Sequence, residues 1–323
     1  MKTAKEVLAL VNKALADLPF ERKPEGLYAP VKYELSLGGK RIRPVLMLMS
    51  YELYRDDVES IIPTALGLEM YHNYTLLHDD VMDRADMRRG KPTVHKVWNE
   101  NTAILSGDAM LVLAYQLMGQ AKADYLKPVL DLFTETALEI GEGQQYDMEF
   151  EQRSDVREEE YIEMIRLKTS VLLACAVKMG AMQAGAPQED LEHLYAFGEN
   201  LGLAFQLQDD LLDVYGDPET FGKKIGGDIL EGKKTFMLIN AYRLANADQR
   251  AALDSWFANS SDSAAKIAAV TDLYNQIGIK QLAETKIKHY FDVAFDSLDA
   301  VGLPAQRKEP LRTLALSLFG RQS

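Results

Sequence analysis

The chain carries the stretch LLHDDVMD at residues 76–83 and a distant counterpart, QLQDDLLD, at residues 206–213. Each holds three aspartates in the pattern Asp-Asp-x-x-Asp within an otherwise apolar run. In an α-helix, positions i, i+1 and i+4 fall within about 100° of one another, so three carboxylates crowd one side of each helix. Like charges this close raise one another's pKa unless a cation lies between them. Mg²⁺ suits this role, because it prefers oxygen ligands and usually combines a few carboxylates with substrate phosphates.

A solvated helix face is the alternative interpretation of an acidic stretch. Here two copies share one spacing, and each follows apolar and amide residues rather than a charged surface pattern. This repetition favours two walls of a single site that binds an anionic substrate through metal ions.

Length and periodicity favour one helical domain. The 323 residues are compatible with two average domains or one large one, but no Pro- or Ser-rich linker, low-complexity tract or fixed-period repeat divides them. Apolar residues recur mainly at spacings of three and four, and strand-like alternation is scarce. We therefore expect an all-α fold in a single domain spanning residues 1–323.

The composition restricts the partners and the compartment. A net charge of −13 argues against nucleic-acid binding and against adhesion to anionic membranes. No apolar run approaches the ~20 residues of a membrane span, and residues 1–20 lack a signal-peptide core. The single cysteine, Cys175, lies in an apolar run and fits a reducing compartment. We expect a cytoplasmic protein without stable membrane insertion.

Positive charge is concentrated beside glycines. The segment GGKRIRP at residues 38–44 places three cations within four residues, and RRGKPT at residues 88–93 forms a predicted loop after the first acidic helix. A third segment, KKIGGDILEGKKT at residues 223–235, follows the second acidic helix. Guanidinium groups and glycine-rich backbone suit phosphate oxygens. The pattern of acidic helix followed by basic loop is what binding of metal and phosphate together requires.

Helical spacing adds further candidates. We predict long helices at residues 44–54, 61–82 and 191–215, with an interruption at Gly26 and Pro30 near the amino terminus. His72 lies seven residues before the first acidic motif and on nearly the same face. It is either a satisfied core histidine or a hydrogen-bond donor to phosphate.

Several motifs occur in a fixed order: GGKRIRP (38–44), DDVMD (79–83), RRGKPT (88–93), GD (107–108), GQQYD (143–147), KT (168–169), FQLQDDLLD (205–213) and the lysine loop (223–235). In these motifs the chain resembles the trans-isoprenyl diphosphate synthases, or polyprenyl synthetases, of the short-chain farnesyl and geranylgeranyl type. The resemblance runs from about Gly38 to Thr235. It implies an antiparallel helical bundle around a deep central cavity, usually a homodimer.

The resemblance implies a Mg²⁺-dependent prenyltransferase. Isopentenyl diphosphate would be condensed with dimethylallyl, geranyl or farnesyl diphosphate, giving farnesyl or geranylgeranyl diphosphate. Three Mg²⁺ ions are expected with diphosphate bound, and Mn²⁺ can substitute. The implied ligands are Asp79 and Asp83 for two ions and Asp209 for the third, with Asp80, Asp210 and Asp213 in support.

The same resemblance assigns the substrate contacts. The residues that would bind the allylic diphosphate are Arg88, Lys168, Lys223 and Lys233. Those near the reacting carbons would be Thr169, Gln206 and Gln144. Those that would bind isopentenyl diphosphate are Lys40, Arg43, His72 and Arg89. Neutralising the leaving diphosphate and fixing both substrates would supply most of the catalysis. The released diphosphate would take the proton, so no side-chain base is required.

Product length depends on two residues in this family, here Tyr74 and Thr75. A helical wheel places Thr75 about 40° from Asp79 and Tyr74 about 140° from it. The role of Tyr74 therefore rests on the resemblance alone. One large and one small residue predict products of fifteen or twenty carbons.

Two other functions stay open. A class I terpene cyclase would share the acidic helix, but it normally carries a different second motif and needs no site for isopentenyl diphosphate. A subunit of a heteromeric longer-chain synthase is the other alternative. Such subunits commonly lose aspartates, whereas both motifs are complete here.

Overall fold

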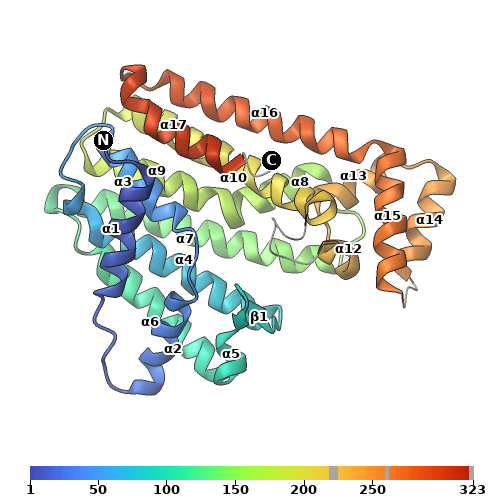
Figure 1. The fold of residues 1–323 in the computed structure, drawn as a ribbon, viewed down its shortest axis with the longest axis horizontal. Helices are drawn as coiled ribbons and strands as arrows, with labels where there is room; N and C mark the ends of the chain where they lie inside the picture. Colours follow the sequence, from blue (N-terminus) through green and yellow to red (C-terminus); the bar gives the residue numbers. More distant parts are fainter. Residues whose placement is uncertain (218–224, 259–261, 320–323) are drawn as a thin grey trace. The chain divides into compact units, whose positions relative to one another are not determined.

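The computed structural model describes residues 1–217, 225–258 and 262–319, which are helical almost throughout (Figure 1). The helices are α1 (Ala4–Ala16), α2 (Glu25–Ser36), α3 (Ile42–Glu52), α4 (Ile62–Met82), α5 (Val94–Val97), α6 (Glu100–Met118), α7 (Ala123–Glu151), α8 (Glu158–Ile165), α9 (Val171–Gln183), α10 (Gln188–Tyr215), α12 (Gly227–Glu231), α13 (Phe236–Leu244), α14 (Ala247–Ala258), α15 (Ser263–Ile277), α16 (Ile279–Ala300) and α17 (Ala305–Phe319). A 3₁₀ segment, η1 (Val58–Ile61), a π-helical segment, η2 (Arg166–Ser170), and two short strands, β1 (Met87–Arg88) and β2 (Lys91–Pro92), complete the described elements. The prediction of an all-α fold is confirmed.

The chain divides into two compact units. Unit 1 consists of Met1–Thr134, Cys175–Glu192 and Gly302–Leu311. Unit 2 holds the described residues of Glu135–Ala174, His193–Val301 and Arg312–Ser323. Four of the five unit boundaries fall within helices α7, α9, α10 and α17, and the fifth lies between α16 and α17. The single domain expected from the sequence stays a prediction.

Helix α4 is the centre of unit 1. It packs most extensively against α6 and also contacts α3, α1 and α2. Every residue from Thr64 to Tyr71 is buried, as expected for a helix surrounded by others. Beyond Tyr71 only Asn73, Leu77 and Asp80 are buried. The carboxyl-terminal half of α4 therefore leaves the core on one side, and this half carries the first acidic motif.

Helix α2 differs from the sequence-based expectation, which placed an interruption at Gly26 and Pro30. Both residues lie inside the helix. A proline there clashes with the carbonyl four residues earlier and removes one backbone hydrogen bond. That earlier residue is Gly26, near the first turn, and the helix buries Val31 and Leu35. Packing of this face outweighs the unfavourable propensity.

A β-hairpin follows the first acidic motif, where the sequence predicted a loop. β1 and β2 pair antiparallel, with Met87 opposite Pro92 and Arg88 opposite Lys91. The two turn residues, Arg89 and Gly90, have φ angles of 52° and 76°. Positive φ at both central positions is the geometry that matches the twist of a two-residue hairpin.

Unit 2 has its own apolar core. Leu203, Leu207, Leu211 and Val214 form a helical stripe on α10 that packs among residues of α8, α12, α13, α15 and α16. The polar residues of the second acidic motif alternate with this stripe, so the core fixes the rotation of α10. No described helix of the chain has the length and hydropathy of a membrane span.

Candidate active site

The first acidic motif ends α4 in unit 1. Asp80 is 2% exposed, and its oxygens accept hydrogen bonds of 2.7 and 2.6 Å from Nε and Nη2 of Arg88. Burial raises the pKa of Asp80, and the Arg88 guanidinium opposes that rise. Asp79 is half-buried and Asp83 is exposed. Asp80 thus orients Arg88, whereas Asp79 and Asp83 lie nearer to solvent.

The hairpin and the turn before α3 meet through Arg89. Its Nη1 donates a hydrogen bond to the carbonyl oxygen of Gly38. Gly39 has a φ of +128°, and a methyl group added there would lie 2.8 Å from Cζ of Arg89. Only glycine therefore allows the guanidinium to lie against this turn. Two basic segments that are 51 residues apart are brought together.

Arg89 and Arg43 form the cationic group of unit 1, and Arg43 contacts His72. Arg43 Nη1 lies 3.2 Å from Nε2 of His72. Burial and the charge of Arg43 hold the pKa of His72 well below its usual range, so the imidazole is neutral and its Nε2 accepts this hydrogen bond. Burial also lowers the pKa of Arg43, to about 10. His72 therefore orients Arg43, and Lys40 is exposed close by in sequence.

A buried ionic layer supports the cationic group, and sequence reasoning missed it. Arg41 has a φ of 50° and donates from Nη1 to Glu69 (2.6 Å) and from Nη2 to the carbonyl of Leu35 (2.7 Å). Asn73 donates to the same Glu69 oxygen at 3.0 Å. Glu34 is wholly buried and lies within range of the charges of Arg41 and Arg89. Burial raises its pKa to about 7. The signal for Glu69 was available, because it is the one charge in the apolar first half of α4.

Unit 2 contains a polar pocket of about 150 Å³ around the second acidic motif. Its lining combines carboxylates, lysines, uncharged polar side chains and two apolar residues: Asp147, Tyr161, Met164, Ile165, Lys168, Thr169, Gln206, Asp209, Asp210, Asp213, Asp228, Lys233 and Thr235. The pocket thus gathers the predicted residues of α10, the Lys168–Thr169 pair and Lys233.

Lysine and aspartate are paired on one wall of this pocket. Lys168 Nζ donates to Oδ2 of Asp147 at 2.6 Å. Burial alone would raise the pKa of Asp147, but the charges of Lys168 and Lys233 bring it below its ordinary value. Both lysines therefore act on a carboxylate that stays ionised. Asp147 belongs to the motif at residues 143–147, but the motif alone did not predict a role for it.

Asp210 is held by neutral donors on the other wall. The Tyr161 hydroxyl donates to its Oδ2, and Gln206 Nε2 donates to its Oδ1 at 3.4 Å. Burial raises the pKa of Asp210 to about 7, and the charge of Asp228 adds to the rise. Thr169 Oγ1 donates to Oε1 of Gln206 at 3.4 Å. A chain of polar contacts thus runs from Thr169 to Tyr161.

The remaining predicted residues of unit 2 are placed as follows. Asp213 is 8% exposed and its Oδ2 accepts a 3.0 Å hydrogen bond from the backbone N–H of Asp228. Gln144 is half-buried on α7 and does not line the pocket. Lys223 lies outside the described residues. Tyr161 and Asp228 were missed, although Tyr161 lies two turns before Lys168.

The two residues predicted to set product length lie on α4 in unit 1. Thr75 Oγ1 donates to the carbonyl of His72 at 2.8 Å, as a threonine does within a helix. The ring of Tyr74 lies between those of Tyr71 and His78, with centroid distances of 5.4 and 4.7 Å. Tyr74 is therefore fixed in an aromatic row below the acidic motif.

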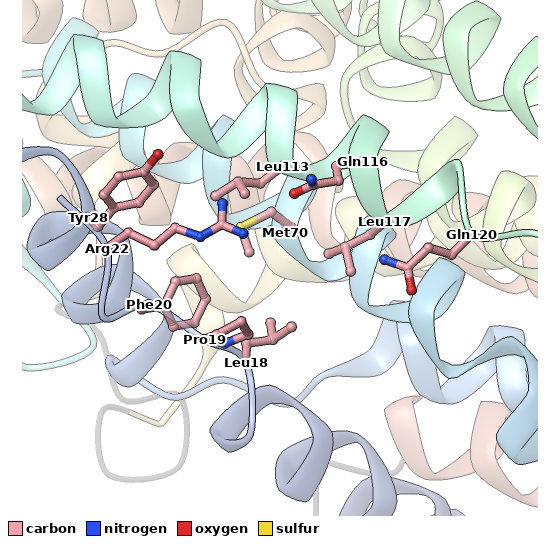
Figure 2. A pocket seen from close by; sticks show the side chains of 10 residues that line it. All are labelled: Leu18, Pro19, Phe20, Arg22, Tyr28, Met70, Leu113, Gln116, Leu117 and Gln120. Atoms are coloured by element: carbon pink, nitrogen blue, oxygen red, sulfur yellow. The ribbon is translucent and has the colours of Figure 1, made fainter. Parts of the chain in front are cut away.

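Another pocket, of about 400 Å³, lies in unit 1, and none of the predicted site residues lines it. Figure 2 shows the Arg22 side chain extending across it from the segment between α1 and α2, above Phe20 and toward Met70 and Leu113. Met70 precedes Asp79 by nine residues, which is about half a rotation around α4. This pocket therefore lies on the opposite face of α4 from Asp79.

The carboxylates fit a Mg²⁺ site that substrate completes. Within the part of the chain that the structure describes, no three Asp, Glu, His or Cys side chains converge into a metal site built from protein groups alone. Mg²⁺ usually takes one or two carboxylates and fills its octahedral shell with phosphate oxygens and water. The carboxylates of each motif, taken separately, have the chemistry for such sites.

Comparisons with known proteins agree with this chemistry. The sequence profile of a family described as Polyprenyl synthetase matches residues 24–274. A geranylgeranyl diphosphate synthase of Methanosarcina mazei is 42% identical over 234 residues, which cover 72% of each chain. A short chain isoprenyl diphosphate synthase of Methanocaldococcus jannaschii is 42% identical over 247 residues, covering 76% of this chain and 75% of that protein. A crystal structure of a geranylgeranyl pyrophosphate synthase has a TM-score of 0.94 and 44% sequence identity, covering 100% of both chains.

Proposed function

The chain belongs to the polyprenyl synthetase family, and from this premise we propose that it is a prenyltransferase that condenses isopentenyl diphosphate with an allylic diphosphate. The family generally depends on Mg²⁺. The proposed product is farnesyl or geranylgeranyl diphosphate, formed by head-to-tail addition in the all-trans configuration. The names of the two relatives above support the short-chain assignment.

The presence of two separate cationic sets carries this proposal. One set surrounds Arg43 and Arg89 in unit 1, and the other surrounds Lys168 and Lys233 in unit 2. A condensation needs two diphosphate sites, whereas a terpene cyclase needs one. We assign isopentenyl diphosphate to the first set, with Lys40 and the neutral His72. We assign the allylic diphosphate to the second set together with Arg88.

Ionisation of the allylic substrate is the step that the second set supports. The bond between the allylic carbon and the diphosphate oxygen breaks, and the diphosphate leaves with the electron pair. Bound Mg²⁺ would neutralise the growing charge on the leaving group. Asp79, Asp83 and Asp209 would hold these ions, three of them when diphosphate is bound. Lys168 and Lys233 would stabilise the same charge through fixed contacts.

The oxygen dipoles of Thr169 and Gln206 would stabilise the resulting carbocation. Gln206 donates its amide N–H to Asp210, which turns its carbonyl oxygen toward Thr169. The oxygens of Thr169 and Gln206 can therefore face the electron-poor carbon without a competing positive charge. The double bond of isopentenyl diphosphate attacks this carbon, and the proton lost from the adduct goes to the released diphosphate. No side chain needs to act as the base.

The test is incubation of the purified chain with labelled isopentenyl diphosphate, Mg²⁺ and each allylic primer in turn, followed by sizing of the products. Fifteen- or twenty-carbon diphosphates are expected, and a chelator should abolish their formation. Turnover only after a second protein is added would instead identify a heteromeric subunit. Hydrocarbon formed without isopentenyl diphosphate would identify a cyclase.

Product length has its own test. Tyr74→Ala shortens a side chain in the aromatic row below the acidic motif. If Tyr74 limits the chain, the variant should release products at least one five-carbon unit longer than wild type. Tyr146→Ala, at an exposed tyrosine of α7, is the control and should leave the product unchanged. Identical products from Tyr74→Ala and wild type would remove Tyr74 from this role.

The assembly is part of the same proposal. Ile104, Leu105 and Val112 on α6 are 44%, 60% and 68% exposed, and a subunit interface would cover apolar side chains of this kind. We assign this surface to the expected homodimer. Light scattering of the purified chain should give twice the monomer mass, and Leu105→Glu should reduce it. The cytoplasmic location and single-domain organisation stay predictions from the sequence.

A further inference from the structure

The helical path between α8 and α9 contains one turn of π-helix, η2, which carries Lys168 and Thr169. A π-helical turn inserts an extra residue into the helix and is less favourable than the α-helix, so it persists only where the surroundings maintain it. The sequence of η2, RLKTS, holds no proline or glycine that would break a helix locally. The cause must therefore lie in the elements packed against η2.

Two glycines on neighbouring helices of unit 2 contact η2 closely. A methyl group added to Gly143 of α7 would lie 2.8 Å from Cα of Lys168. A methyl group added to Gly202 of α10 would lie 2.6 Å from Cα of Ser170. These are backbone atoms of η2, which cannot move aside as a flexible side chain can. Ordinary carbon contacts begin near 3.5 Å, so either substitution would displace η2 by up to about 1 Å.

Each glycine lies one helical turn before a residue that binds η2. Asp147 follows Gly143 by four residues and accepts the 2.6 Å hydrogen bond from Lys168. Gln206 follows Gly202 by four residues and accepts the 3.4 Å hydrogen bond from Thr169. On each side of η2, the close contact at the glycine therefore sets the distance between η2 and the neighbouring helix. The hydrogen bond one turn later depends on that distance.

We propose that Gly143 and Gly202 are positioning residues, which set the place of η2 so that Lys168 and Thr169 face the allylic substrate. This inference rests on the proposed function for the identity of that substrate. Neither glycine touches substrate. Each acts through the backbone of η2, and the pair fixes η2 from two sides.

The chain provides matched controls for both glycines. Gly198 lies one turn before Gly202 on α10, and a methyl group there would lie 2.6 Å from Cα of Ala174. Gly198→Ala therefore makes an equally close clash with α9, but at Ala174, six residues beyond Lys168. Gly141 lies on α7 with nothing within 4 Å of an added methyl group, so Gly141→Ala tests the helix without a clash.

The experiment measures stability, kinetics and binding for the four alanine variants. Gly202→Ala and Gly198→Ala should lower the melting temperature by similar amounts. Only Gly143→Ala and Gly202→Ala should raise KM for the allylic diphosphate or lower kcat, by about 10- to 100-fold, with KM for isopentenyl diphosphate unchanged. The same two variants should bind inorganic diphosphate with Mg²⁺ at least about tenfold more weakly in calorimetry. Gly141→Ala should match wild type.

Equal losses in Gly198→Ala and Gly202→Ala would overturn the proposal, because the contacts would then be structural only. Failure of both Gly143→Ala and Gly202→Ala to fold would overturn it for the same reason. Wild-type kinetics in both variants would also overturn it. The binding measurement keeps this test separate from the proposed function, since a wild-type chain that binds diphosphate without turnover contradicts only the latter.

Discussion

Asp80 in unit 1 and Asp210 in unit 2 occupy the same place in the two Asp-Asp-x-x-Asp motifs, but they are held differently. Asp80 accepts two hydrogen bonds from the cation Arg88. Asp210 accepts from the neutral groups of Tyr161 and Gln206. Burial raises the pKa of both carboxyls, and only Asp80 has a guanidinium in contact to oppose the rise. The same motif can therefore either orient a cation or be oriented by neutral donors.

The largest expected effect compares the first aspartates of the two motifs. Asp79 is proposed as a ligand of the two-ion motif and Asp209 as the ligand of the third ion. Asp79→Asn should lower kcat/KM by about 1000-fold and Asp209→Asn by about 100-fold, because each loses charge that binds metal. Steady-state kinetics at several Mg²⁺ concentrations would measure both. Asp86→Asn, at an exposed aspartate nearby, is the control, and equal losses in all three variants would contradict the assignment.

The next effect concerns the cation that holds Asp80. Arg88→Ala should lower the free energy of unfolding by about 3 kcal/mol, because a buried carboxylate loses its partner. Arg84→Ala, at an exposed arginine, should change it by less than about 0.5 kcal/mol. Urea denaturation would measure both. Adding Asp80→Asn to Arg88→Ala should restore part of the loss, and no restoration would show that the pair is not the cause.

A smaller effect is expected from pH acting on Glu34. This carboxyl is wholly buried, and neither of its oxygens makes a hydrogen bond within the described residues. Burial, and then the charge of Asp80, raise its pKa from 4.5 to about 7, while Arg88, Arg89 and Arg41 oppose the rise. Between these values the folded chain binds more protons than the unfolded chain, so stability falls as pH rises and levels off above pH 7.

Glu34→Gln tests this pH dependence. Wild type should lose about 2–3 kcal/mol of stability from this group between pH 5 and pH 8, and the variant should lack that loss. Denaturant titrations at a series of pH values would measure it. Glu25→Gln, at an exposed residue of the same helix, should retain the wild-type profile. A variant profile parallel to wild type would show that Glu34 titrates normally.

The smallest effect concerns the neutral donor to Asp210. Tyr161→Phe should lower the free energy of unfolding by about 1.5 kcal/mol, because a buried carboxyl loses a hydrogen bond. Tyr215→Phe removes an exposed hydroxyl that donates to Asn275 and should cost about 0.5 kcal/mol or less. Thermal and urea denaturation would compare the two variants. Equal losses would mean that the hydroxyl of Tyr161 is not important to Asp210.

The sequence predicted what depends on local spacing. Helical periodicity placed both acidic motifs on helices, and the helical fold is confirmed. The basic segments were found because glycine and clustered cations are visible in a linear sequence. The helix at residues 25–36 was missed, because burial of Val31 and Leu35 decides it rather than the propensity of Pro30.

The sequence could not predict what depends on packing. The pairing of Arg41 with Glu69 and of Tyr161 with Asp210 joins residues 28 and 49 positions apart. The π-helical turn at Lys168 has no local signature, because the glycines that crowd it belong to other helices. Two residues of these contacts could have been noticed in the sequence. Glu69 is a charged residue in an apolar run, and Tyr161 lies two helical turns before Lys168.

The path of the chain through its two units has a consequence for anyone who would dissect it. Unit 1 is assembled from three stretches, and the short ones, Cys175–Glu192 and Gly302–Leu311, come after long portions of unit 2. No single cut therefore yields either unit intact. A fragment ending at Thr134 would lack α9, whose Val177 carbonyl accepts a hydrogen bond from Ser50 of α3. The buried face of α3 would then be exposed to solvent. Expression of separate halves should give aggregates, and catalysis should require the uninterrupted polypeptide.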